Sequence, residues 1–229
     1  MTGPVLDSEV AESFPLDELE MRISRRVLEG LPVGERSDTR ERILEKAVEL
    51  FAQRGFEACS VRDLAAGVGI KAPGIYSHFR SKEEILSEAV LRTMGNFLAA
   101  VAAPLNTGDA VSALRETIDR HVKYQLAHLM LARANDFLLN SESAGRYLAE
   151  DDRELLIDVR RGYYRLVRAR IHAAVGDNLA VDLTVATVSV VSMCDDVAIW
   201  YRPGGRLDPS QVANQLWLAV CGVLGLSDI

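Results

Sequence analysis

The residues with the clearest chemistry lie in one short predicted helix and favour contact with a nucleic acid. This helix begins near Lys71 or Ala72, and its outer side presents Lys71, Ala72, Gly74, Tyr76, Ser77 and His78. Such side chains hold phosphate oxygens, and small residues at a helix start let the backbone approach base edges. Lys82 adds a charge beside the positive end of the next helix. Alternatively, Tyr76 and His78 are simply exposed residues of a solvated face.

A helix and a tight turn come before this segment. Ser60 can cap the helix while Asp63 reaches back to it, a variant of the capping box. Apolar residues then follow at helical spacing: Val61, Leu64, Ala65 and Val68. Gly67 or Gly69 can supply the positive φ that ends a helix and reverses the chain.

The second helix is bounded on both sides. Pro73 costs least in the first turn of a helix, and Ile75 and Phe79, four residues apart, face inward. Ser81, with a glutamate three residues later, forms another capping box and opens a third helix. The pattern therefore predicts a second helix within residues 71–80 and, as a whole, a DNA-binding helix-turn-helix.

The run from Thr39 to Leu86 resembles the DNA-binding domain of the TetR family of transcriptional regulators. The matching motifs are an amphipathic first helix closing on ELFAQRGF, then SVRDLA, GIYSHF and SKEEIL. The resemblance implies an all-helical homodimer. Its N-terminal domains would bind a palindromic operator, and its larger C-terminal domain would bind a small effector.

The resemblance also implies roles for individual residues. Phosphate contacts fall on Ser60, Arg62, Tyr76, His78 and Lys82, and base contacts fall on Lys71, Ala72, Gly74 and Ser77. Thr39 and Arg40 can touch the DNA backbone at the start of the first helix. Lys71 departs from the family pattern, because many members have a serine or threonine cap there.

Charge is distributed unevenly along the 229 residues. The formal net charge is -7, yet residues 38–82 hold eight basic and six acidic residues. The positive field is thus concentrated on the predicted DNA-binding region. We expect operator affinity to fall steeply as salt rises.

The sequence predicts three parts: an acidic leader (1–37), a helix-turn-helix domain (38–85) and an effector-binding and dimerisation domain (86–229). The start of the leader is expected to be disordered, and Asp17–Gly30 can form an amphipathic helix. That helix either packs on the dimer or the DNA-binding domain, or serves as an arm whose arginines follow the DNA backbone.

Several features predict a cytoplasmic protein without a membrane partner. The N-terminus is acidic and lacks the apolar core of a signal peptide. No stretch reaches about 18 apolar residues. Cys59, Cys194 and Cys221 lie far apart within apolar patterns, as expected of buried thiols in a reducing compartment.

After Ser81, which opens the third helix, the sequence pattern is helical throughout, so the predicted fold class is all-α. The helix-breaking residues and turns between the helical segments place helices at 81–102, 109–128, 129–139, 151–175, 182–201 and 209–224. The last two carry apolar surface wider than one side of a small domain can cover, which predicts a four-helix dimer interface. The family resemblance implies the same, and the segment WYRPGGRL resembles a branch that includes acyl-CoA-responsive regulators of fatty-acid and steroid breakdown.

Aromatic and polar residues on the central helices are candidates for a largely apolar effector site. They are His121, Tyr124, His128, Asn135, Phe137, Tyr163, Tyr164, Arg168, Trp200 and Arg202. The alternative is a core with satisfied polar residues and a solvated basic face. His121 and His128 are too far apart to share a metal without a third ligand, so no metal or cofactor is expected.

No nucleophile, metal or phosphate-loop constellation is visible, which argues against an enzyme. The sequence thus predicts a homodimeric repressor that binds double-stranded operator DNA and is released by a small, lipid-like effector, an acyl-CoA being one candidate. The alternative is a helix-turn-helix regulator that is activating or ligand-independent.

Overall fold

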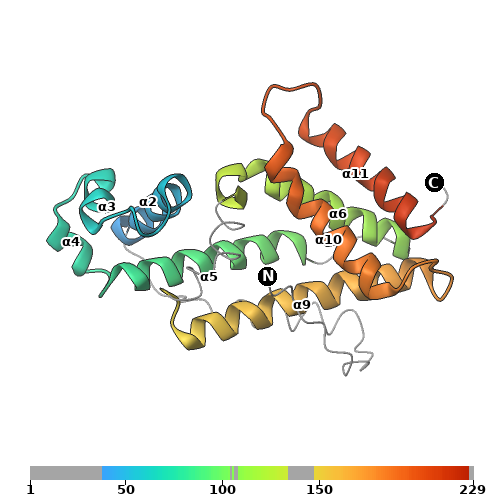
Figure 1. Ribbon diagram of the computed structural model, residues 1–229, viewed down its shortest axis with the longest axis horizontal. Coiled ribbons are helices and arrows are strands. Elements are labelled where there is room, and N and C mark those ends of the chain that lie inside the picture. The colour runs from blue at the N-terminus through green and yellow to red at the C-terminus, as the bar shows by residue number, and fades with distance from the viewer. Residues whose placement is uncertain (1–37, 104, 106–107, 134–146, 227–229) are drawn as a thin grey trace. The chain divides into compact units, whose positions relative to one another are not determined.

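The computed structural model describes residues 38–103, 105, 108–133 and 147–226, and all named elements in these ranges are α-helices (Figure 1). They are α2 (Asp38–Arg54), α3 (Val61–Val68), α4 (Ala72–Tyr76), α5 (Lys82–Val101), α6 (Ala110–Ala127), α9 (Glu150–Val175), α10 (Leu183–Trp200) and α11 (Pro209–Leu224). The predicted leader helix and the candidates Asn135 and Phe137 lie outside the described residues. The all-α prediction is confirmed.

The contacts within the chain divide it into two compact units. The head unit comprises, among the described residues, 38–96, 128–133 and 147–157. The body unit comprises the described parts of 97–127 and 158–226. Helices α5 and α9 contribute residues to both units, and the predicted three-part division at 37 and 85 stays a prediction.

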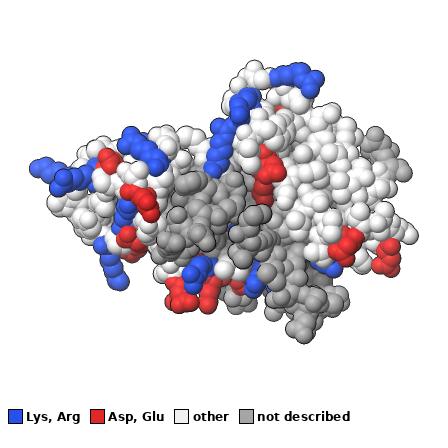
Figure 2. All heavy atoms as spheres, in the orientation of Figure 1, with Lys and Arg blue, Asp and Glu red and all other residues white. Residues whose placement is uncertain are grey.

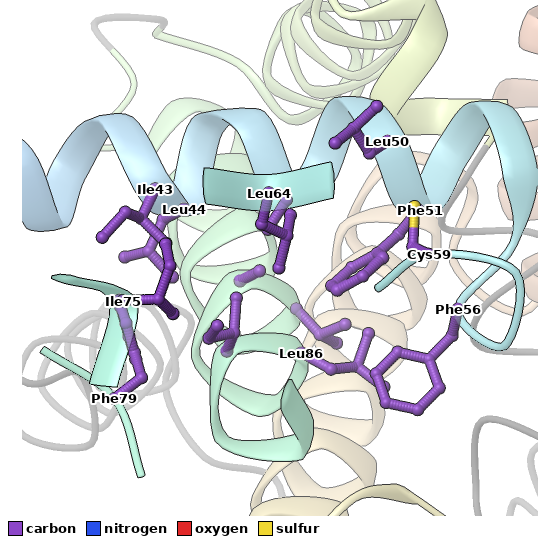
Figure 3. Close-up of a cluster of buried hydrophobic side chains, with 14 of the residues drawn as sticks. Ile43, Leu44, Leu50, Phe51, Phe56, Cys59, Leu64, Ile75, Phe79 and Leu86 are labelled. Atoms are coloured by element: carbon purple, nitrogen blue, oxygen red, sulfur yellow. The ribbon is translucent and has the colours of Figure 1, made fainter. Parts of the chain in front are cut away.

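The head unit is built on one apolar face of α2. Its buried residues recur at helical spacing: Ile43, Leu44, Ala47, Leu50 and Phe51. Leu64 of α3, Ile75 of α4 and Leu86 of α5 meet this face, as Figure 3 shows. Burial of Ile75 and Phe79 agrees with their predicted inward orientation.

Helix α3 begins and ends as its sequence predicts. The Ser60 hydroxyl accepts the N–H of Asp63 at 3.1 Å, and the Asp63 carboxylate accepts the N–H of Ser60 at 2.8 Å. Gly69 ends the helix with φ +77°, a conformation that favours glycine. Gly67 has a different role, because a Cβ there would lie 2.7 Å from Cγ of Lys46 on α2.

Helix α4 lies within the predicted range 71–80 and ends at Tyr76, four residues before its limit. The N–H of Arg80, which would continue the helical ladder to Tyr76, donates instead to the carboxylate of Glu84. Ser81 still caps α5 by accepting the N–H of Glu84 at 3.1 Å. The capping box predicted for Ser81 and Glu84 is therefore only half formed, because the Glu84 carboxylate accepts the N–H of Arg80 and not that of Ser81.

In the body unit, α6 packs against α10 and α11, and these two helices pack against each other. Helix α11 has the predicted bounds, and Asp208 and Gln211 form its capping box with both bonds at 2.9 Å. Helix α10 begins after its cap Asp182. Within the described ranges, α10 is long and apolar enough to cross a membrane by length and composition alone, and such a property is shared by core helices of soluble proteins.

Candidate DNA-binding surface and interior polar cluster

Five of the eleven candidate DNA contacts are exposed on the head unit: Ser60, Arg62, Lys71, Tyr76 and Ser77. Tyr76 is 57% exposed although it is a large aromatic residue. Figure 2 shows Lys and Arg side chains at the end of the head that carries α3 and α4, with acidic side chains among them. This end can therefore present phenol, hydroxyl and cationic groups to phosphates.

The start of α4 is held by the backbone and not by a side-chain cap. Lys71 occupies the N-cap with extended backbone and makes no side-chain capping bond, and the turn is held by the N–H of Gly74 donating to the Lys71 carbonyl at 2.8 Å. A Cβ on Gly74 would meet Ile70 Cδ1 at an ordinary 3.5 Å. Packing within the head therefore does not require glycine at position 74.

Arg40 is engaged inside the head unit. Its guanidinium pairs with the buried carboxylate of Glu88 and lies 4.3 Å from the ring centroid of Phe79. These contacts fix the start of α2 against the segment that follows α4. Thr39 and His78 are partly buried, as are Ala72 and Gly74.

Lys82 is also engaged within the head. Its Nζ donates to the carbonyl oxygens of Phe56 at 2.9 Å and Cys59 at 2.8 Å. An ammonium has three N–H donors, so these two bonds leave one for a further acceptor. The residue thus holds the turn before α3, a role that its place in the sequence did not indicate.

Sequence reasoning missed Arg42 as a helix cap. Its guanidinium donates to the carbonyl of Val68 at 2.6 Å and so satisfies an acceptor at the C-terminal end of α3. The two residues are 26 positions apart, and no local pattern links them.

In the body unit, a polar cluster surrounds the buried ring of His121. Nδ1 lies 2.7 Å from the hydroxyl of Tyr163, and Nε2 lies 3.0 Å from Oδ1 of Asp195. Gln125 donates to the same Asp195 oxygen at 2.9 Å. The edge-on ring of Phe97 lies 4.8 Å from His121, 5.5 Å from Tyr124 and 5.2 Å from Tyr163, as measured between centroids.

The partners determine how protons are placed when His121 is neutral. The carboxylate of Asp195 only accepts, so Nε2 carries the hydrogen and Nδ1 accepts from Tyr163. Burial raises the pKa of Tyr163 well above its ordinary value, so this hydroxyl keeps its proton. The Asp195 side chain is 48% exposed, and the cluster therefore runs from a buried phenol to the surface of α10.

The structure thus brings together three of the predicted effector residues, His121, Tyr124 and Tyr163. Tyr164 is also buried on α9, with a pKa raised mainly by burial. The remaining described candidates do not join this cluster. Arg168 donates to Thr184 at 3.1 Å, and Arg202 donates to the carbonyls of Ile199 and Tyr201. Trp200 is about half exposed, and His128 lies in the head unit.

Two further residues of the body were not singled out from the sequence. Phe97 joins the cluster, and Arg170 is only 2% exposed and donates to the hydroxyl of Thr117. Arg170 follows Arg160, Arg161, Arg165 and Arg168, the arginines of the alternative solvated basic face, so the pattern gave no sign of its burial.

In the part of the chain that the structure describes, no group of three or more His, Cys, Asp or Glu could hold a metal ion. Cys59, Cys194 and Cys221 are buried free thiols.

Two family models match this chain. Residues 43–89 match the model described as bacterial regulatory proteins, tetR family. Residues 107–224 match the model described as tetracyclin repressor-like, C-terminal domain. The first match covers the exposed candidate DNA contacts between residues 60 and 77, and the second covers His121, Tyr163 and Asp195 of the interior cluster.

Individual proteins are similar over most of the chain. The HTH-type transcriptional repressor KstR2 of Mycobacterium tuberculosis is 29% identical over 202 residues, which cover 82% of this chain and 94% of KstR2. A crystal structure of a tetR-family regulatory protein from Rhodococcus RHA1 has a TM-score of 0.74 at 26% identity, covering 84% of this chain and all of that one. AibR, crystallised with isovaleryl coenzyme A and operator DNA, has the same fold, with a TM-score of 0.66 at 24% identity over 82% of this chain and 98% of AibR.

Proposed function

This chain belongs to the TetR family of bacterial transcriptional regulators, which are DNA-binding proteins and not enzymes, and on that premise we propose that it is a homodimeric repressor released from a palindromic operator by a lipid-like effector. The observation that carries the proposal is the exposure of side chains at both ends of α4. Lys71 at its N-cap, Tyr76 in its last turn and Ser77 at its C-cap are exposed, and a glycine at position 74 lets the backbone approach base edges.

We assign the DNA contacts to this surface and test them by operator binding. The duplex is one that the wild-type protein selects from a random library, and affinity is measured by fluorescence anisotropy at several salt concentrations. Lys71→Ala and Tyr76→Phe should each weaken binding, whereas Glu45→Gln, on the exposed side of α2, should not. Unchanged affinity for both α4 variants would reject the assignment.

The dimer is supported by apolar side chains left exposed on α10 and α11. They are Val185, Ile199 and Trp200 on α10 and Leu218 on α11. Exposed Ala219 and Gly222 on α11 would let a partner helix approach closely. Two recognition helices of a dimer would then read half-sites one duplex turn apart.

The dimer is tested by sedimentation equilibrium. Leu218→Glu should yield monomers that lose operator affinity, because a charge would be buried in the apolar interface. Ile157→Glu is the matched control, since Ile157 is a similarly exposed apolar residue of the head unit. A dimeric Leu218→Glu protein would reject the α10–α11 interface.

We place the effector site at the aromatic rings of Phe97, His121, Tyr124 and Tyr163. The solved AibR complex, of the same fold, supports acyl-CoA thioesters as the first class to test. Arg168 or Arg202 could neutralise the phosphates of such a ligand. Shifting a two-state equilibrium decisively needs about 5 kcal/mol of differential binding, which a buried acyl chain can supply.

The test is a titration of the protein–operator complex with isovaleryl-CoA, longer acyl-CoAs and the matching free acids. Release by a thioester but not by its acid supports the acyl-CoA proposal. A complex that resists the whole panel rejects it and favours the ligand-independent or activating alternative.

A further inference from the structure

The turn that joins α2 to α3, residues 55–59, determines where α3 begins. Gly55 has φ +79°, and the N–H of Cys59 donates to the Phe56 carbonyl at 3.3 Å. Ser60 follows directly and caps α3. A displacement of this turn therefore displaces the helix start that carries Ser60 and Arg62.

Lys82 holds this turn from the start of α5. Its ammonium bonds two carbonyl oxygens of the turn and lies 4.1 Å from the ring centroid of Phe56. The Phe56 ring is itself buried beside Leu86, as Figure 3 shows. The turn is thus tied to the helix that follows the helix-turn-helix.

Tyr147, ninety positions after Glu57 in the sequence, also contacts this turn. The ring of Tyr147 lies 4.5 Å from that of Phe56, and its hydroxyl donates to the Glu57 carboxylate at 2.5 Å. A bond to a charged acceptor is stronger than a neutral one. Tyr147 thus contacts the turn through both its ring and its hydroxyl.

The chain after Tyr147 is fixed to the same hydrophobic core. Leu156, in the first turns of α9, is 5% exposed and belongs to the buried cluster of Phe51, Phe56 and Leu86. Helix α9 continues without a break to Tyr163 in the proposed effector cluster. One element therefore carries both the anchor of the head and a residue of the body cluster.

We infer that Tyr147 is a positioning residue for DNA binding, which couples the start of α9 to α3 through Phe56 and Glu57. This inference rests on the proposed function, because it requires that α3 and α4 bind DNA. Coupling between two sites is reciprocal. If the Tyr147 contact favours the DNA-binding arrangement of the turn, bound DNA must in turn stabilise the segment that Tyr147 anchors.

The experiment measures amide hydrogen exchange of residues 148–157 with and without the library-selected duplex. In the wild type, DNA should slow exchange in this segment. Tyr147→Phe and Glu57→Gln should both abolish most of this slowing and weaken operator binding by about three- to tenfold, with the salt dependence unchanged because no phosphate contact is lost. Tyr201→Phe, a buried tyrosine of the body unit, should behave as the wild type.

The outcomes separate the two hypotheses. If the selection yields no duplex, the proposed function fails and the inference fails with it. If the wild type binds DNA but exchange at 148–157 does not change, the inference alone is overturned. Variants that only lose thermal stability, with DNA-dependent exchange intact, assign Tyr147 a structural role and also overturn it.

Discussion

The ammonium of Lys82 lies 4.1 Å from the ring centroid of Phe56, beside two carbonyl oxygens to which it donates. The family resemblance assigns this lysine to a DNA phosphate, whereas these contacts give it an additional role inside the head unit. The two roles make different predictions, because a phosphate contact releases counterions and an internal contact does not.

Lys82→Met keeps most of the stem but removes the ammonium. We expect weaker operator binding and a lower Tm, since two carbonyl oxygens lose their donor. The salt dependence of binding distinguishes the mechanisms. A slope of log K against log salt smaller by about one indicates a lost phosphate contact, and an unchanged slope indicates a positioning role alone. Unaltered affinity and Tm together would contradict both roles.

Glycines 69 and 74 should respond in opposite ways to alanine. Gly69 has φ +77°, so Gly69→Ala should destabilise the protein by roughly 1–2 kcal/mol. Gly74 lies within α4 with room for a Cβ, so Gly74→Ala should keep or raise the Tm while lowering operator affinity through the added methyl group. Thermal unfolding and anisotropy check both expectations, and full operator affinity of Gly74→Ala would remove position 74 from the proposed contact surface.

Local patterns predicted the caps and most helix bounds, because these depend on neighbours in sequence. Ser60 with Asp63, Asp208 with Gln211, and the bounds of α11 are examples. The sequence placed the second helix within residues 71–80 but did not fix its end at Tyr76, because the Arg80 N–H donates to Glu84 and spacing does not reveal which acceptor it takes.

The buried faces of the last helices were harder to predict because both helices are apolar around much of their circumference. The spacing groups Trp200 with Ala186, Val190 and Val197 on one apolar face of α10, yet those three are buried and Trp200 is 49% exposed. On α11 the spacing groups Ala219 with Val212 and Val220, yet these two are buried and Ala219 is exposed, and Trp217 is buried as well. Contacts such as Tyr147 with Glu57 and His121 with Asp195 join residues 90 and 74 positions apart, which no sequence period encodes.

Acid should weaken the start of α10. The backbone N–H groups of Val185 and Thr184 hold the pKa of Asp182 below its ordinary value of 3.8. A depressed pKa in the folded state means that the stabilisation is complete above the unfolded value and is lost as the pH falls below it. Stability should therefore decline below about pH 4, in part through this cap.

Asp182→Asn provides the matched test, because asparagine is an equally good N-cap that does not titrate. The variant should match the wild type near pH 7 and lose less stability between pH 4 and pH 2 in denaturant titrations. Identical acid dependence of the two proteins would show that this cap does not contribute to the decline.

Tyrosines 163 and 76 should separate stability from DNA binding. Tyr163→Phe removes the partner of a buried histidine nitrogen, which should cost about 1–3 kcal/mol and lower the Tm by roughly 2–4 °C for each kcal/mol. Tyr76→Phe removes a hydroxyl from a side chain that is 57% exposed, so the Tm should not change while operator affinity falls. Differential scanning fluorimetry and anisotropy on both variants test the pair. The opposite pattern, a stable Tyr163→Phe protein and an unstable Tyr76→Phe protein, would be incompatible with an interior hydrogen-bond cluster in the body and an exposed DNA-binding helix in the head.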